Sequence, residues 1–326
     1  MVRIGAIGIG GIFHAHLNAI RELSSECQLV AALDQNPKAV ERLAQDNAVV
    51  ATTDEHEFWQ TSMDAVIISV PNRFHRRYVE TAAERGIAVL TEKPMAATLT
   101  DAAAMVEAVS RAGVVNLIGF VNRYRPQVQR LKALIDHDQL GPIFGYREVS
   151  SGARLTNPQI GLEWRMQPAL SGAGASSDFG SHTLDMATWL LGPLASLDVR
   201  LATFIPREGQ LPGNDDMALY SGRFASGALF SAIDSRVGPG LYRIEIFGSK
   251  GYAALDINPA GDLTVVSYRT EDPITVPETP SGPSDAFFAQ MRHFVTAVAT
   301  NTPVEPNLAT GYEVERLIAE SRAGAR

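Results

Sequence analysis

The first 120 residues alternate short apolar runs with longer amphipathic stretches. The apolar runs show no polar alternation, which is typical of strands covered on both faces, and the longer stretches repeat apolar positions at helical spacing. Strands separated by helices predict a doubly wound parallel sheet. We expect strands at residues 4–7, 28–33, 65–70, 87–91 and 115–120, and helices at 12–22, 39–46, 75–85 and 99–111.

The pattern changes after residue 120, where strand-like runs follow one another with turn residues between them. Consecutive strands predict an antiparallel sheet in an α+β domain, so we expect a nucleotide-binding domain at 1–120 and a second domain at 121–326. The closing helices can return to the first domain. We expect strands at 196–203, 217–224, 228–236, 242–248, 251–256 and 263–268, helices at 127–137, 181–191, 285–300 and 311–323, and a proline-rich surface excursion at 272–284.

An open antiparallel sheet has a second face that helices cover only in part. We therefore expect this face to pair two copies of the chain, in a homodimer or a homotetramer.

Composition narrows the classes of protein. With 326 residues, 45% hydrophobic and 20% charged, the chain is typical of a packed two-domain globular protein. A net charge of −8 without any basic run argues against a nucleic-acid partner. No run approaches the roughly 20 apolar residues of a membrane span. The single cysteine, Cys27, and the absence of a leader pattern favour a cytoplasmic location.

A glycine-rich turn follows the first predicted strand and opens the first predicted helix. Gly8 and Gly10 occupy the first two glycine positions of such a turn, and they let backbone N–H groups approach a pyrophosphate at the helix N-terminus. Phe13 stands where a third glycine is usual. The turn reads Gly8-Ile9-Gly10-Gly11-Ile12-Phe13.

Asp34 ends the second predicted strand, about 20 residues after the turn, where an acidic residue contacts the adenosine ribose of a dinucleotide. No arginine follows it directly to receive a 2′-phosphate, which favours NAD over NADP. Lys38 and Arg42 leave NADP open. The alternative is a helix-capping aspartate in a fold without a cofactor.

Two further strands end in polar residues. Pro71, Asn72 and His75 follow the third strand, and Glu92 and Lys93 follow the fourth. Ligands bind beyond the carboxyl ends of strands in an open parallel sheet, so we expect these residues at the cofactor site. A solvated loop charge is the alternative for Lys93.

A carboxylate and an imidazole, Asp178 and His182, stand four residues apart after a glycine-rich stretch. If the segment is helical they share one face, as a proton-accepting histidine and its orienting carboxylate require. Asp185 is the lesser candidate for the same role.

Several residues with hydrogen-bond donors or aromatic faces suit a carbohydrate pocket. The alternatives are salt bridges between domains for the arginines and a core position for the tryptophan. Histidines without thiolates do not favour a metal site. The candidates for substrate contact are Asn122, Arg123, Tyr124, Arg125, Trp164 and Arg165.

These motifs together resemble the glucose-fructose oxidoreductase, inositol dehydrogenase and rhizopine-catabolism family of NAD(P)-dependent oxidoreductases. The resemblance covers essentially the whole chain. It rests on the glycine turn, Asp34, Pro71-Asn72 with His75, Glu92-Lys93-Pro94, and Asp178-Phe-Gly-Ser-His182.

The resemblance implies a Rossmann domain followed by an α/β domain whose open sheet mediates oligomerisation. It also implies that Lys93, Asp178 and His182 form the catalytic group. A hydride would pass between the nicotinamide and a secondary alcohol carbon of a sugar, an inositol or a related polyol. His182 would take the hydroxyl proton and Lys93 would stabilise the developing charge on oxygen.

Two other functions stay open. One is a glycosidase of the same fold that oxidises and re-reduces its sugar through bound NAD. The other is a non-catalytic sensor of nucleotide or sugar.

Overall fold

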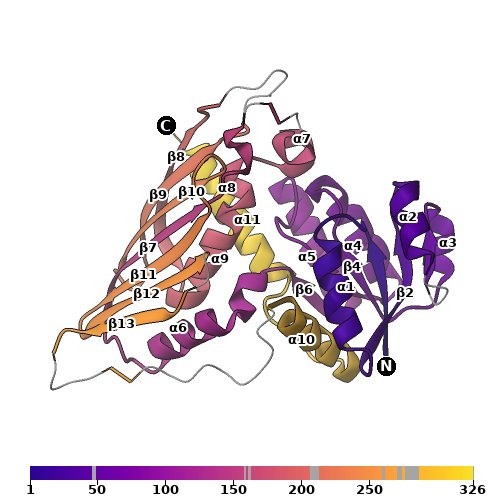
Figure 1. Ribbon diagram of the computed structural model, residues 1–326, viewed down its shortest axis with the longest axis horizontal. Helices are drawn as coiled ribbons and strands as arrows, with labels where there is room; N and C mark the ends of the chain where they lie inside the picture. The colour runs from indigo at the N-terminus through magenta and orange to yellow at the C-terminus, as the bar shows by residue number, and fades with distance from the viewer. Residues whose placement is uncertain are drawn as a thin grey trace. The chain divides into compact units, whose positions relative to one another are not determined.

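The computed structural model describes residues 1–45, 49–157, 159–160, 163–205, 213–258, 261–269, 274–275 and 286–325. They form two compact units (Figure 1). Unit 1 contains Met1–Val121 and Asp285–Glu315, and unit 2 contains Asn122–Ser284 and Arg316–Arg326. The division falls inside the last helix, α11 (Leu308–Ala323).

Unit 1 is built on a six-stranded parallel sheet in the order β3-β2-β1-β4-β5-β6. This confirms the doubly wound fold class. The strands are β1 (Val2–Ile7), β2 (Cys27–Leu33), β3 (Val50–Thr52), β4 (Ala65–Ile68), β5 (Ala88–Thr91) and β6 (Asn116–Ile118). The helices are α1 (Phe13–Glu22), α2 (Pro37–Leu43), α3 (Glu55–Gln60), α4 (His75–Glu84), α5 (Leu99–Ala112) and α10 (Ala286–Thr300), with the 3-10 turn η1 (Asn72–Phe74).

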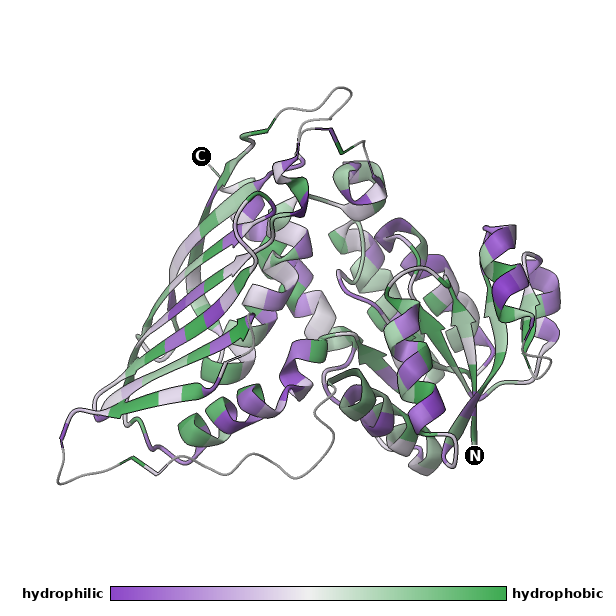
Figure 2. Ribbon diagram, in the orientation of Figure 1, coloured by the Kyte–Doolittle hydropathy of each residue, from purple (hydrophilic) through white to green (hydrophobic). Residues whose placement is uncertain are grey.

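The strands of this sheet are hydrophobic along their length, as Figure 2 shows. Every residue of β4 and β5 is buried, because helices cover both faces. The closing helix α10 packs on α1 and β1. β3 and α3 are too short for periodicity to reveal, and our sequence analysis missed both.

Unit 2 is built on a seven-stranded sheet in the order β13-β12-β11-β7-β10-β9-β8. All neighbours are antiparallel except β7 and β10, which are parallel. Helices contact one face of the sheet (Figure 1). The strands are β7 (Ile143–Ser151), β8 (Leu194–Ala202), β9 (Met217–Phe224), β10 (Leu229–Ser235), β11 (Leu241–Gly248), β12 (Gly251–Asn258) and β13 (Leu263–Ser267). The helices are α6 (Pro126–Asp136), α7 (Pro168–Ser171), α8 (Ala175–Asp178) and α9 (Gly180–Leu191), with the 3-10 turns η2 (Val121–Tyr124), η3 (Arg154–Thr156) and η4 (Trp164–Met166).

The central strand β7 is the main element that the sequence pattern did not predict. Its core-facing positions include Glu148 and Ser150, so a polar sequence occupies a buried face and the hydrophobic alternation is lost. Because β7 and β10 are parallel, Ser151 pairs with Ser235 and the loops that follow both strands start side by side.

No helix within the described ranges is long and apolar enough to span a bilayer. The predicted proline-rich excursion at 272–284 lies outside the described residues except for positions 274 and 275.

Candidate active site

The glycine turn of unit 1 leaves room for a ligand against the backbone. Gly8 has φ +87°, and a Cβ there would lie 2.7 Å from the carbonyl oxygen of Ser69, so a larger residue does not fit. At Gly10 and Gly11, by contrast, a Cβ would meet no atom within 4 Å. Open space on the ligand side of both glycines suits the close approach of a pyrophosphate.

Backbone donors at this turn also suit an anion. Among the described residues, the N–H groups from Gly10 to Phe13 donate no hydrogen bond. They stand at the start of α1, where the first N–H groups of a helix have no partner within it. The donors and the helix dipole therefore both favour a phosphate at this position.

Asp34 is tied to the glycine turn. One carboxylate oxygen accepts a hydrogen bond from the N–H of Ile9 at 2.7 Å, and the other accepts from the N–H of Asn36 at 2.8 Å. Each carboxylate oxygen accepts more than one hydrogen bond, so Asp34 retains capacity for ribose hydroxyl groups.

The side chains of two predicted cofactor residues are buried. The Phe13 side chain is buried in the core of unit 1, so only its backbone is available to a phosphate. The His75 ring is fully buried between the carbonyl oxygens of Met95 at 2.9 Å and Val70 at 2.8 Å. Burial lowers the pKa of His75, and a neutral ring donates through one nitrogen only. The His75 ring therefore supports the loops that carry Val70 and Met95, and its contact with a cofactor stays a prediction.

Glu92 also serves the local structure. Its Oε1 lies 2.8 Å from Nε2 of buried His16, and its Oε2 accepts from the N–H of Lys93 at 3.2 Å. A Cβ at Gly119 would lie 3.0 Å from this carboxyl group, so glycine makes room for it. Lys93 itself is half-buried, and Asn72, after Pro71, is buried.

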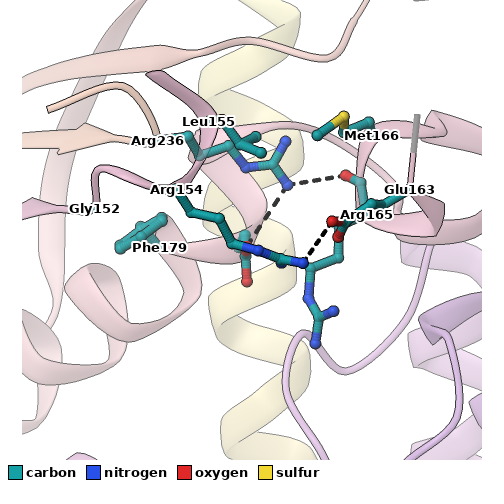
Figure 3. A pocket seen from close by; sticks show the side chains of 9 residues that line it. Gly152, Arg154, Leu155, Glu163, Arg165, Met166, Phe179 and Arg236 are labelled. Carbon is teal, nitrogen blue, oxygen red and sulfur yellow. Dashed lines mark hydrogen bonds and ion pairs between the residues drawn. The ribbon is translucent and has the colours of Figure 1, made fainter. Parts of the chain in front are cut away.

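Unit 2 contains a cavity of about 300 Å³ (Figure 3). Asp178 is one of the residues that line it. Oδ2 of Asp178 lies 3.6 Å from Nη2 of Arg236. Arg236 also lines the cavity and is only 4% exposed. Arg236 also donates to the side chain of Asn214 at 2.8 Å and to the carbonyl oxygen of Arg165 at 2.9 Å. These contacts fix the guanidinium group, which in turn holds Asp178 at the cavity.

Asp178 and His182 belong to separate helical segments. Asp178 is the last residue of α8, and His182 lies in the first turn of α9, where its N–H donates to the carbonyl oxygen of Phe179 at 2.9 Å. The helix expected at 181–191 is confirmed as α9, whereas Asp178 lies outside it, in α8. That Asp178 orients His182 stays a prediction.

Arg123 and Asp185 form a buried pair that anchors α9. Nη2 and Nε of Arg123 donate to the Asp185 carboxylate at 2.6 to 3.2 Å, and the guanidinium carbon lies 5.2 Å from the ring centre of Trp189. Asp185 thus holds Arg123, and its role as the lesser partner of His182 stays a prediction. Because both residues are in unit 2, the proposed interdomain salt bridge is corrected to one within the unit.

A second anchor lies next to His182. The hydroxyl of buried Thr183 is 2.9 Å from Oε1 of Glu148 and 2.7 Å from Oδ1 of Asp234. A hydroxyl has one hydrogen, so one of these contacts needs a proton from a carboxylic acid. Burial raises the pKa of Asp234 well above its ordinary value, which favours its protonated form. Burial also raises the pKa of Glu148 to about 7.

Four of the remaining predicted substrate contacts form two local pairs. Nε of Arg125 donates to Oδ1 of buried Asn122 at 2.8 Å. The guanidinium carbon of Arg165 lies 4.3 Å from the ring centre of half-buried Trp164. Arg165 lines the cavity with Asp178, so the structure brings these two predicted residues together.

Three residues of the site, His16, Arg154 and Arg236, were not predicted from the sequence. Arg154 and Arg236 follow the parallel strands β7 and β10, whose ends are neighbours, and the unpredicted β7 concealed this relationship. His16 carried a signal, since it lies one turn into the helix that starts at the glycine turn.

Comparison with known proteins places this geometry in a family. Residues 2–120 match a family model described as an oxidoreductase family with an NAD-binding Rossmann fold, and residues 128–254 match the GFO/IDH/MocA C-terminal domain.

Curated relatives and solved structures agree along the whole chain. Levoglucosan dehydrogenase of Pseudarthrobacter phenanthrenivorans is 26% identical over 99% of this chain and 96% of its own. The scyllo-inositol 2-dehydrogenase (NAD⁺) of Bacillus subtilis is 24% identical over 99% and 94%. A solved structure of levoglucosan dehydrogenase with NADH superposes with a TM-score of 0.89 at 25% identity, covering 99% and 97%. The chain therefore belongs to the GFO/IDH/MocA family of oxidoreductases, with an NAD-binding Rossmann domain at its N-terminus.

Proposed function

We propose that this protein oxidises a secondary hydroxyl group of a sugar or polyol with NAD, or catalyses the reverse reduction. The observation that carries the proposal is the cavity at Asp178 in a chain whose other unit is an NAD-binding Rossmann domain. The named activities of the levoglucosan and scyllo-inositol dehydrogenases support a sugar or polyol as the substrate class.

The residues of unit 1 fit the cofactor. The N–H groups from Gly10 to Phe13 would hold the pyrophosphate, and Asp34 would accept hydrogen bonds from the adenosine ribose. Bound NAD supplies the hydride acceptor for the reaction.

The reaction assigns three roles to side chains of the protein. His182 accepts the proton of the substrate hydroxyl group as a general base. Asp178, held by Arg236, orients His182 or a neighbouring hydroxyl group. Lys93 donates a hydrogen bond to the reacting oxygen and stabilises the negative charge that develops there. The proposal requires Lys93 and His182 to act on the same hydroxyl group.

We propose NAD as the preferred form of the cofactor. The carboxylate of Asp34 stands at the expected ribose position and would repel a 2′-phosphate. Lys38 and Arg42 on α2 are exposed cations that would favour NADP if they approached the same site.

We further propose that the open face of the second sheet pairs copies of the chain. Its strands carry exposed apolar side chains, including Phe144 on β7 at 60% and Leu229 on β10 at 56%. A contiguous apolar patch on a sheet face is typical of an interface.

We also propose a cytoplasmic location, since Cys27 is a buried free thiol.

The direct experiment measures NADH formation over a panel of hexoses, pentoses and inositols, with NADP in parallel. We expect turnover with at least one sugar or polyol and a higher kcat/KM with NAD. Nitrophenyl glycosides form a second arm, because a glycosidase releases chromophore without accumulating NADH. Tight NAD binding without turnover on any member of the panel would favour a sensor instead.

A further inference from the structure

The cavity at Asp178 carries more positive than negative charge. Three arginines and two acids contribute to its wall, and all five belong to unit 2 (Figure 3). The charged residues are Arg154, Glu163, Arg165, Asp178 and Arg236.

Two of the arginines are neutralised by the two acids. Arg236 lies 3.6 Å from Asp178, and its Nη1 and Nη2 also donate to Asn214 and to the carbonyl oxygen of Arg165. Arg154 pairs with Glu163. Arg236 is buried, and its guanidinium group already makes these three contacts, so it serves to hold Asp178 rather than to bind an anion.

The third arginine, Arg165, has no acidic partner among the described residues. Its guanidinium carbon lies 4.3 Å from the ring centre of Trp164, and no dashed line in Figure 3 ends on its side-chain nitrogens. The stacked ring supports the guanidinium plane and leaves its N–H edges available. Those edges match the two oxygens of a carboxylate or a phosphate.

The rest of the wall strengthens this preference. Leu155, Met166 and Phe179 give it an apolar part, where a charged hydrogen bond is screened less than in open water. The pair of Arg154 and Glu163 is partly exposed, with 61% and 28% of the side chains accessible. An exposed ion pair holds its partners weakly, so Arg154 is able to turn toward a second anion.

We infer that the substrate is an anionic sugar or polyol, with a carboxylate or phosphate group held by Arg165 and assisted by Arg154. The inference rests on the proposed function and adds the chemical class of the substrate. The negative group lies in the cavity of unit 2, apart from the hydroxyl group that reacts.

The test compares matched neutral and anionic substrates with the full-length protein. D-glucose is set against D-glucuronate and D-glucose 6-phosphate, which separates the carboxylate and phosphate sources, and D-galactose against D-galacturonate. Turnover is followed by NADH formation. Calorimetric titration of the NADH-bound protein measures binding of the same compounds without turnover.

Three variants complete the design. R165Q removes the charge and R165K keeps it without the two-pronged geometry. R111Q is the matched control, because Arg111 is exposed on α5 and pairs only weakly with Glu107 at 3.7 Å. NAD affinity is measured for each variant, since an Arg165 that binds cofactor phosphates would lower it.

We expect kcat/KM for at least one anionic compound to exceed that of its neutral partner by about tenfold or more, the usual scale of one charged hydrogen bond. R165Q should lose that advantage through KM, R165K should keep part of it, and R111Q should match the wild type. NAD affinity should stay within about twofold.

Turnover of neutral sugars without this advantage would overturn the inference and leave the proposed function in place. Suppose that the wild type turns over none of the compounds but binds an anionic sugar by calorimetry, and that R165Q abolishes this binding. That result would overturn the proposed function and support the inferred contact between Arg165 and the anionic group. Failure of every anionic compound to bind would overturn the inference, as would a large loss of NAD affinity in R165Q.

Discussion

Nε2 of His16 lies 2.8 Å from Oε1 of Glu92, and the His16 side chain is fully buried. The contact joins the helix that starts at the glycine turn to the strand end that carries Lys93. Glu92 also accepts a hydrogen bond from the N–H of Lys93. The His16 imidazole therefore holds the Glu92 carboxylate, which in turn holds the backbone of the proposed catalytic lysine. His16 is a positioning residue in this account.

Removing the imidazole should therefore affect stability and turnover together. H16A leaves a buried carboxylate without its partner, which lowers the free energy of unfolding by about 1–3 kcal/mol. kcat should fall because Lys93 loses its fixed support. H14A is the control, since His14 is exposed on the same helix. Urea unfolding and steady-state kinetics measure both effects, and an H16A protein as stable and active as H14A would refute the role.

The stability of the protein should depend on pH through Glu148. Burial raises its pKa from 4.5 to about 7, so between these values the folded protein keeps a proton that the unfolded chain releases. The free energy of unfolding should thus decrease as the pH rises from about 4.5 to about 7. E148Q removes this contribution. Urea unfolding from pH 5 to pH 8 measures the slope.

Glu315 is a second buried acid that contributes to this slope. Burial raises its pKa to about 7 as well, and it accepts the N–H of Met95 at 2.8 Å in unit 1. The wild-type slope therefore contains both groups, and E148Q or E315Q should each reduce it. An E148Q protein with the full wild-type slope would mean that Glu148 does not hold the proton.

Asp34 should decide the choice of cofactor. D34A removes the ribose acceptor and leaves the N–H groups of Ile9 and Asn36 without their acceptor, so kcat/KM for NAD should fall about tenfold or more. Activity with NADP should fall less, because the repulsion of a 2′-phosphate disappears. Parallel kinetics with both cofactors measure the ratio, and an unchanged ratio would contradict the assignment.

A single charge on the open sheet should dissociate the proposed oligomer. L229K places an ammonium group in a patch that the interface would bury, at a cost of several kcal/mol. We expect light scattering at micromolar concentration to give a dimer or tetramer for the wild type and a smaller species for L229K. A monomeric wild type would dispose of the interface.

Much of the fold was predictable because its signals are local. The strands of unit 1 are mainly hydrophobic on both faces. Helix α5 begins after Thr98, which caps its N-terminus, and ends at Gly113, which has φ +66°. The hydrophobic pattern and the capping residues therefore predict the same elements. β7 escaped prediction because buried Glu148 and Ser150 break its alternation. The polar atoms of such a face form hydrogen bonds with residues that are distant in the sequence, such as Thr183 for Glu148. The spacing of residues along the chain does not reveal these partners.

The positions of some candidate site residues follow from the sequence, and their roles stay predictions. Asp34 and Arg165 stand where sequence position suggested, beside the glycine turn and in the cavity. The side chains of His75 and Arg123 are directed inward by buried partners, which are the carbonyl oxygens of Met95 and Val70 for His75 and the Asp185 carboxylate for Arg123. Residue type gives no warning of this outcome.

The central claim is that an ammonium group and an imidazole act on one substrate hydroxyl group in the presence of NAD. The most direct measurement is the rate of NADH formation with the preferred sugar or polyol for the wild type, K93M and H182A, with NAD affinity measured on each. The account predicts a fall in kcat of about 10²-fold or more in both variants, the usual contribution of acid–base catalysis, with NAD affinity retained. Wild-type turnover in either variant would contradict it.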